Sequence, residues 1–154
     1  CRGGEILTNV PPLGYVLGDE GGGVHLGRNL LNGIFKGHIP LKEEFLAATG
    51  LSYEEIIRRV YREPYANRFL ASFAPFILAH TDCPEVRKMV RRSFGEFASR
   101  NLSRYPQGLL VSFVGGIAAR FGELLRETLE AEGYRIGTIV ESPAEGLLKY
   151  HHGR

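Results

Sequence analysis

The last third of the chain alternates between strand-like and helix-like patterns of apolar residues. Residues 109–114 and 135–140 are two apolar runs of strand length. Between them, apolar residues recur at i, i+4, i+7, i+8 and i+12 and predict a helix ending at Gly133: Ile117, Phe121, Leu124, Leu125 and Leu129. A capping box with proline at the first helical position opens another short helix over 142–150. This order predicts a right-handed parallel strand–helix–strand crossover.

The middle of the chain is predicted to be helical. The expected helices run from near Asp19 to Phe35, over 42–49, over 52–61 behind a Ser52–Glu55 capping box, over 67–79 with a bend or break at Pro75, and from an acidic cap at 82–85 to about Arg104. We expect residues 4–9 to add a strand to the sheet that contains 109–114. The sequence therefore predicts an α/β fold with a helical middle section and a parallel βαβ close.

Length, composition and charge indicate one ordinary globular domain. The chain has 154 residues, 44% of them hydrophobic and 23% charged, which is enough for a single core. A formal net charge of +2 is too small for a nucleic-acid footprint. The basic groups around Arg59 and Arg91 recur at helical spacing and are interpreted as solvated helix faces. The longest apolar stretch, 69–79, is about half of what a membrane span requires. Neither a nucleic-acid nor a membrane partner is expected.

The cysteines and histidines give no metal signature. Cys1 and Cys83 form no C-x-x-C pair, and no histidine stands at zinc-ligand spacing from them. Neither a disulfide framework nor a structural metal is indicated, and a reducing cytoplasm fits this usage. No metal-ligating residue is predicted in this chain.

A glycine cluster at 14–23 encloses the adjacent carboxylates Asp19 and Glu20, just before a helical pattern. Glycine lets the backbone approach a ligand closely. A carboxylate at a helix start can cap the helix or accept hydrogen bonds from the hydroxyls of a ligand. Both interpretations of Asp19 stay open from the spacing alone.

The pair Gly115–Gly116 directly follows the strand-like run at 109–114. In parallel sheets, ligands gather beyond the carboxyl ends of the strands. No G-x-x-x-x-G-K-[ST] or G-x-G-x-x-G motif occurs in the chain, so the pair is not a standard phosphate loop. A tight strand-to-helix turn without a ligand remains the alternative.

Three segments together, 9–23, 113–118 and 142–150, resemble the C-terminal domain of N-acetylglucosamine kinase-like proteins. These are grouped with the benzoyl-coenzyme A reductase activator-type ATPases in the sugar kinase, Hsp70 and actin superfamily. The resemblance covers essentially the whole chain, and its most specific part is Gly-Asp-Glu-Gly at 18–21. It implies a ribonuclease H-like (actin-like ATPase) C-terminal domain over residues 1–154, as a fragment of a two-domain kinase. The catalytic aspartate and both phosphate loops would then lie upstream of Cys1.

The resemblance also implies roles for individual residues. Gly14 and Asp19 would line the sugar pocket, with Asp19 accepting hydrogen bonds from sugar hydroxyls and Leu13 at the edge. Gly115 and Gly116 would pass beneath the adenosine part of ATP, and Ala118 would touch it. In one departure from the family pattern, Gly22 stands where many relatives have serine.

The implied activity is phosphorylation of N-acetylglucosamine, or glucosamine, at its 6-hydroxyl, with ATP and Mg²⁺. The implied partners are the protein's own N-terminal domain, the sugar and, since relatives are often dimers, a second copy. This chain alone is expected to be inactive. One alternative is an activator-type ATPase of a reductase or dehydratase, which needs suitably placed cysteine thiolates. The other is a non-catalytic, sugar-sensing relative.

Overall fold

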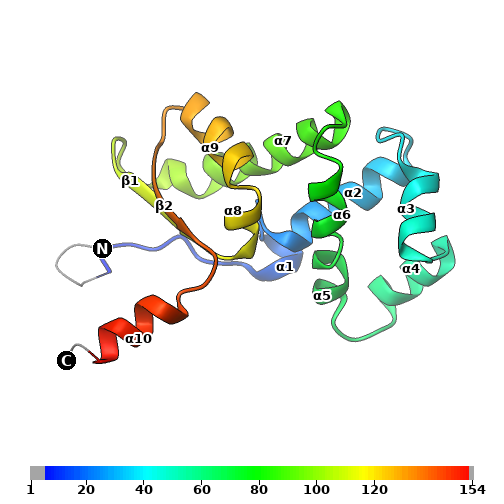
Figure 1. The fold of residues 1–154 in the computed structure, drawn as a ribbon, viewed down its shortest axis with the longest axis horizontal. Coiled ribbons are helices and arrows are strands. Elements are labelled where there is room, and N and C mark those ends of the chain that lie inside the picture. Colours follow the sequence, from blue (N-terminus) through cyan, green and yellow to red (C-terminus); the bar gives the residue numbers. More distant parts are fainter. Residues whose placement is uncertain (1–5, 153–154) are drawn as a thin grey trace.

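Helices dominate the fold, and a small parallel sheet stands at one end (Figure 1). The computed structural model describes residues 6–152, without the side chains of residues 145 and 149. Its first two thirds contain α1 (Gly14–Leu17), α2 (Gly23–Phe35), α3 (Lys42–Thr49), α4 (Tyr53–Tyr61), α5 (Ala66–Ala71), α6 (Ala74–Ala79), α7 (Pro84–Arg100) and the 3₁₀ helix η1 (Leu102–Arg104). The last third contains β1 (Leu110–Val114), α8 (Gly116–Arg120), α9 (Gly122–Ala131), β2 (Arg135–Val140) and α10 (Ala144–His152). This order confirms the predicted α/β class with its helical middle section.

The two strands pair in parallel, as the crossover prediction required. Leu110 lies opposite Arg135 and Val114 opposite Val140, with an irregularity between Val111 and Phe113. The connection between the strands runs through α8 and α9, which cover one face of the sheet (Figure 1). The expected strand over 4–9 is wrong for residues 6–9, which have no regular structure, and residues 4 and 5 lie outside the described part.

Two predicted helices are each divided in two. The helix expected over 67–79 breaks at Ser72–Phe73 rather than at Pro75, because Pro75 lies in the first turn of α6, where a missing N–H costs nothing. The helix expected from Ile117 onward is interrupted at Phe121, which is the C-cap of α8 and the N-cap of α9. The Phe121 ring is buried against Phe94, with centroids 6.5 Å apart. Tertiary packing of this ring accompanies the break.

Helix capping partly follows the predictions. Ser52 and Glu55 form both bonds of the expected capping box of α4. The acidic cap expected before α7 is wrong, since Cys83 is the N-cap and no side chain caps this helix. Ser142 Oγ accepts a hydrogen bond from the Ala144 N–H at the start of α10. Both bonds of the predicted capping box would join Ser142 to residue 145, whose side chain lies outside the described atoms.

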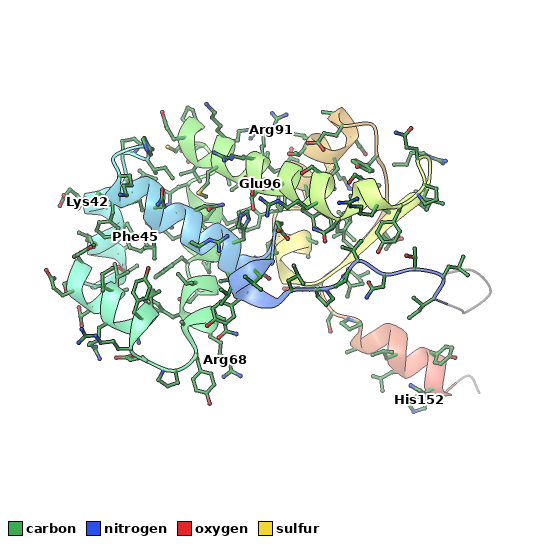
Figure 2. The ribbon with its side chains drawn as sticks, turned by 180° about the vertical axis from the view of Figure 1, so that it is seen from behind. Lys42, Phe45, Arg68, Arg91, Glu96 and His152 are labelled. Atoms are coloured by element: carbon green, nitrogen blue, oxygen red, sulfur yellow. The ribbon has the colours of Figure 1, made fainter. Side chains whose placement is uncertain are left out.

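The core lies around α2, which packs against α5, α6 and α7. Leu26, Leu30 and Ile34 on its inner face are buried. Phe45 lies on α3, in the half of the molecule that contains α3 to α6 (Figure 2). Its ring packs edge-to-face against Phe73 and Phe76, with centroids 5.1 and 5.2 Å away. α2 packs against α7, and α7 packs in turn against α9, which contacts β2.

Candidate functional site

The glycine-rich segment folds as a tight turn that leads into α2. Asp19 has a left-handed backbone with φ of 68°, and its carbonyl accepts a hydrogen bond from the Gly22 N–H at 2.8 Å. Its carboxylate Oδ2 accepts a hydrogen bond from the His25 N–H at 3.2 Å. Asp19 therefore caps the first turn of α2, although the N-cap position itself belongs to Gly22. Because Asp19 remains exposed, its carboxylate is also open to a ligand.

Gly22 makes room for the Asp19 carboxylate. A Cβ atom added at Gly22 would lie 2.5 Å from Asp19 Oδ1. A serine at this position would have to displace the carboxylate from the helix start. The departure at Gly22 is thus coupled to the orientation of Asp19.

The Glu20 carboxylate forms an ion pair with Arg100 of α7, with an N–O distance of 3.0 Å. Burial raises the pKa of Glu20, but its backbone hydrogen bond and the hydrogen bonds from Arg100 and Asn101 outweigh burial and lower the pKa below its ordinary value. Glu20 is therefore ionised at neutral pH, and its ion pair ties the turn to the end of α7.

The two glycine segments meet at one cavity of about 310 Å³. Its lining combines the turn before α2, the turn after β1 and residues of α7, β1, α8 and α9: Glu20, Gly21, Gly22, Phe94, Phe97, Phe113, Val114, Gly115, Gly116, Ile117, Ala118 and Leu125. The rings of Phe97 and Phe113 lie 6.1 Å apart in its wall. The fold thus brings together segments about ninety residues apart in the sequence.

The predicted nucleotide residues line this cavity, whereas the predicted sugar residues lie outside its lining. Leu13 and Gly14 are exposed on the first turn of α1, and the Gly14 carbonyl accepts a hydrogen bond from the Gly18 N–H at 2.8 Å. This bond links α1 to the turn that carries Asp19. The residues predicted for the sugar therefore form a neighbouring surface on the same segment.

The turn after β1 exposes backbone toward the cavity. Gly115 has φ of 134° and ψ of 158°, a conformation that other residues rarely adopt. Its N–H donates to the Val140 carbonyl at 2.9 Å, which fixes the turn to the end of β2. A Cβ added at Gly116 would meet no atom within 4 Å. A flat group can therefore approach this backbone closely.

His25 is a feature of the site that sequence analysis missed. Its side chain is only 5% exposed and lies between α2 and α7. Its Nδ1 lies 2.6 Å from Ser93 Oγ, and its Nε2 lies 3.4 Å from Glu96 Oε2. Burial is the main influence that lowers the pKa of His25, against the opposing effect of Glu96. The sequence shows His25 four residues after Gly21 but gives no sign that α7 would bury it.

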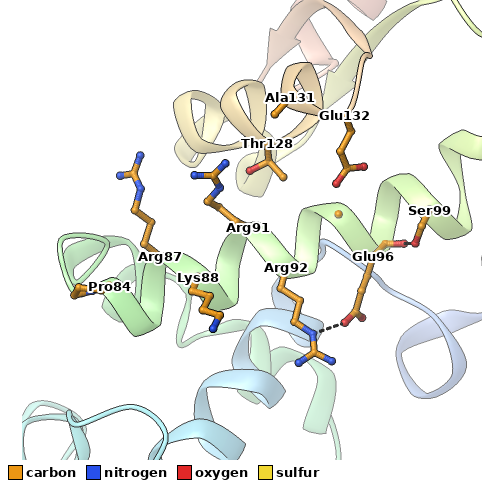
Figure 3. Close-up of a pocket in the computed structure, with 11 residues that line it drawn as sticks. Pro84, Arg87, Lys88, Arg91, Arg92, Glu96, Ser99, Thr128, Ala131 and Glu132 are labelled. Atoms are coloured by element: carbon orange, nitrogen blue, oxygen red, sulfur yellow. Dashed lines mark hydrogen bonds and ion pairs between the residues drawn. The ribbon is translucent and has the colours of Figure 1, made fainter.

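A larger groove of about 850 Å³ lies between α7 and α9, away from both glycine segments (Figure 3). Four basic side chains of α7 line it: Arg87, Lys88, Arg91 and Arg92. Two of them have acidic partners, since Arg87 pairs with Glu127 at 2.7 Å and Arg92 with Glu96 at 3.0 Å. The groove contains none of the residues predicted for ligand binding. Its charges are partly compensated, as expected of a solvated helix face.

Within residues 6–152, no group of three or more histidine, cysteine, aspartate or glutamate side chains is placed to hold a metal ion. Over the same part of the chain, no helix has the length and apolar character needed to cross a membrane. Cys83 is free, and its Sγ donates a hydrogen bond to Glu85 Oε2 at 3.2 Å.

The chain matches no protein-family model and no curated protein. Among solved structures, it is similar to a protein of Porphyromonas gingivalis described as a "Putative N-acetylglucosamine Kinase", with 45% sequence identity and a TM-score of 0.94. The match covers 97% of this chain and 54% of that protein, so the chain spans about half the length of this relative. Along nearly its whole length, the chain is therefore similar in sequence and fold to about half of this Porphyromonas gingivalis protein.

Proposed function

We propose that this chain is part of an ATP-dependent sugar kinase that phosphorylates the 6-hydroxyl of N-acetylglucosamine or glucosamine. The observation that carries this proposal is the meeting of the two glycine segments at one cavity. The similarity to the Porphyromonas gingivalis protein over 97% of the chain supports it. The chain would be the C-terminal domain, with a ribonuclease H-like (actin-like ATPase) fold.

We assign the adenosine end of ATP to the cavity between the two turns. The space of about 310 Å³ is at the small end of ligand pockets and is lined by aromatic side chains and bare backbone. Gly115 and Gly116 would lie beneath the nucleoside, with Ala118 at its side. The open space at the Gly116 Cβ position fits a flat group held against this turn.

We assign the sugar to the surface formed by Leu13, Gly14 and Asp19. The exposed Asp19 carboxylate has one oxygen engaged with the His25 N–H and keeps further lone pairs for sugar hydroxyls. A hydrogen bond from a hydroxyl to a charged acceptor is among the stronger ones in proteins. The capped position of Asp19 would hold this acceptor in a fixed direction.

ATP would supply the phosphoryl group, and catalysis of such a transfer depends mainly on positioning and electrostatic stabilisation. This chain would bind and orient the nucleoside and the sugar. Among the described residues, no three histidine, cysteine, aspartate or glutamate side chains are grouped to hold a metal ion, and Mg²⁺ in kinases is bound by one or two carboxylates together with the phosphates of ATP. We therefore assign the metal, the phosphate loops and the catalytic aspartate to the rest of the protein.

The same proposal needs a second domain from the rest of the polypeptide. Leu110 and Val114 of β1 are 63% and 60% exposed, so one face of the sheet is bare. The chain also covers only 54% of its relative. Both observations support a two-domain enzyme in which this chain alone is inactive, and a homodimer stays a prediction.

The test is ADP release by the full-length protein with ATP and Mg²⁺. The panel contains N-acetylglucosamine, glucosamine, glucose and buffer alone. Sugar-dependent release would support the kinase and rank the acceptors. ATP hydrolysis without sugar dependence would instead indicate an activator-type ATPase, and sugar binding without turnover would indicate a sensor.

A further inference from the structure

The imidazole of His25 is in hydrogen-bond contact with the turn that carries Asp19. His25 contacts this turn twice: its backbone N–H donates to Asp19 Oδ2 at 3.2 Å, and its ring Nδ1 accepts from the Gly21 N–H at 3.4 Å. We propose that His25 is a positioning residue that fixes the Asp19–Gly22 turn for ligand binding. This inference rests on the proposed function, in which the turn presents Asp19 to the sugar and Gly21 to the nucleotide cavity.

The contact with the Gly21 N–H favours one of the two neutral tautomers of the His25 ring. The Gly21 N–H is a donor, so Nδ1 must present its lone pair, and the neutral ring is protonated at Nε2. The Ser93 hydroxyl then donates to Nδ1 at 2.6 Å. The Nε2–H is directed to Glu96 Oε2 at 3.4 Å, and the side-chain amide of Asn29 lies 3.3 Å from the same nitrogen. In this tautomer the single lone pair of Nδ1 is shared between the Ser93 hydroxyl and the Gly21 N–H, and Nε2–H faces Glu96, whereas the Asn29 Nδ2 group is itself a donor and makes no hydrogen bond to Nε2.

Through its contacts with Ser93 and Glu96, the His25 ring joins the turn to α7 as well as to α2. Ser93 is completely buried, and Glu96 lies between α2 and α7 (Figure 2). Between them on α7 stands Phe94, which lines the nucleotide cavity together with Phe97. A Cβ added at Gly21 would lie 3.2 Å from Phe97 Cβ, so the turn and α7 are in close contact there. His25 thereby sets the position of the turn relative to the opposite wall of the cavity.

Protonation of His25 would reverse this arrangement. A protonated Nδ1 is a donor and faces the Gly21 N–H, another donor, so the hydrogen bond to the turn is lost. The charged groups that act on the ring are Glu96 from α7, Arg28 from α2, and Glu20 and Asp19 from the turn. Because burial lowers the pKa of His25, the turn should be released only at pH values below the ordinary histidine range.

The experiment compares two substitutions in the full-length protein. In His25→Asn, the amide oxygen can take the place of Nδ1 and accept from Gly21. In His25→Gln, the amide reaches toward the Nε2 position and leaves the Gly21 N–H without its acceptor. Hydrogen exchange of the segment 19–24 and the KM values for sugar and ATP are measured for both variants.

We expect His25→Gln to speed exchange of the turn and to raise the KM for sugar by about three- to tenfold, as for loss of one hydrogen bond. The kcat should change by less than about twofold, and His25→Asn should restore the wild-type values. Equal behaviour of the two variants, or faster exchange spread over the whole of α2, would overturn the proposal.

A measurement on the unmodified protein avoids any variant that fails to fold. As the pH falls through the pKa of His25, protection of the turn should drop, after correction for intrinsic exchange, while the centre of α2 stays protected. Constant protection of the turn would contradict the proposal. Since exchange does not require turnover, a protein without sugar kinase activity would refute the proposed function and leave the exchange result to decide the role of His25.

Discussion

Gly27, in the middle of α2, should not tolerate even the smallest side chain. A Cβ atom added there would lie 2.0 Å from the Leu70 carbonyl oxygen and 2.7 Å from its carbonyl carbon. These are backbone atoms of α5, so no rotamer change can relieve the contact. Gly27→Ala therefore requires α5 to move away from α2 by about 1 Å, against the packing of a close-packed core.

Two effects of opposite sign determine the size of the change. Alanine favours the helical conformation over glycine by about 1 kcal/mol. Overpacking a core costs about 1 to 3 kcal/mol, and a backbone contact as short as 2.0 Å belongs at the upper end of that range. We expect Gly27→Ala to lower the free energy of unfolding by about 2 kcal/mol. With a urea m-value of about 2 kcal/mol/M, the denaturation midpoint should fall by about 1 M.

Gly95→Ala is the matched control on α7. A Cβ at Gly95 would lie 2.9 Å from Glu132 Oε1, the far end of a flexible side chain that can turn away. The gain in helix propensity should then dominate and raise the urea midpoint by up to about 0.5 M. Urea denaturation followed by far-ultraviolet circular dichroism measures both variants. A Gly27→Ala midpoint at or above that of the wild type would refute the reasoning.

Three further predictions concern the site and the pH dependence of stability. Asp19→Asn should keep the cap of α2, change stability by only a few tenths of a kcal/mol, and weaken sugar binding about ten- to a hundredfold in calorimetry; unchanged affinity would leave Asp19 as a cap alone. Gly116→Val should raise the KM for ATP with the fold retained, whereas valine at Gly115 would be strained at φ of 134°; an unchanged KM would remove this turn from the nucleotide site. The hydrogen bond to Glu44 is the main cause that raises the pKa of His80. The pair of protonated His80 and Glu44 should therefore stabilise the fold fully just below about pH 6.5, and this stabilisation should disappear as the pH rises through the raised pKa. Urea midpoints across this range should decline less in Glu44→Gln than in the wild type, because Glu44 then no longer raises the pKa of His80 while the hydrogen bond to the Phe76 carbonyl still does. A decline of equal size in both would contradict this assignment.

The sequence predicted those elements whose signals are local. The strand over 135–140 and the helix over 42–49 have the predicted bounds, because residue periodicity and flanking glycines determine them. The Ser52–Glu55 capping box also forms as expected, since both of its bonds join residues three apart. The break expected at Pro75 lies at Ser72–Phe73, and the break at Phe121 was missed, because both depend on packing between helices that periodicity does not report.

The candidate site was only partly predictable for the same reason. The two glycine segments could be recognised as ligand-binding candidates from their composition and from their place before or after a regular element. Their meeting at one cavity depends on the packing of α7, which supplies Phe94 and Phe97. The role of His25 depends on Ser93, 68 residues away, and no local pattern links the two.

The glycines of the two segments divide into those that fold the protein and those that leave space for a ligand. A Cβ added at Gly22 would lie 2.5 Å from Asp19 Oδ1, and one added at Gly21 or Gly23 would lie 3.2 Å from the Cβ of Phe97 or Ala71, so all three glycines are closely packed. Their abundance is therefore explained by close packing, and a count of glycines overstates the ligand signal at 18–23. In contrast, a Cβ at Gly14, Gly115 or Gly116 would meet no atom within 4 Å. These are the three glycines assigned to the sugar and the nucleotide. Gly50 at the end of α3 is equally open, so open space alone does not identify a ligand site. The structural argument for ligand binding is that Gly115 and Gly116 combine this open space with a place in the lining of the cavity.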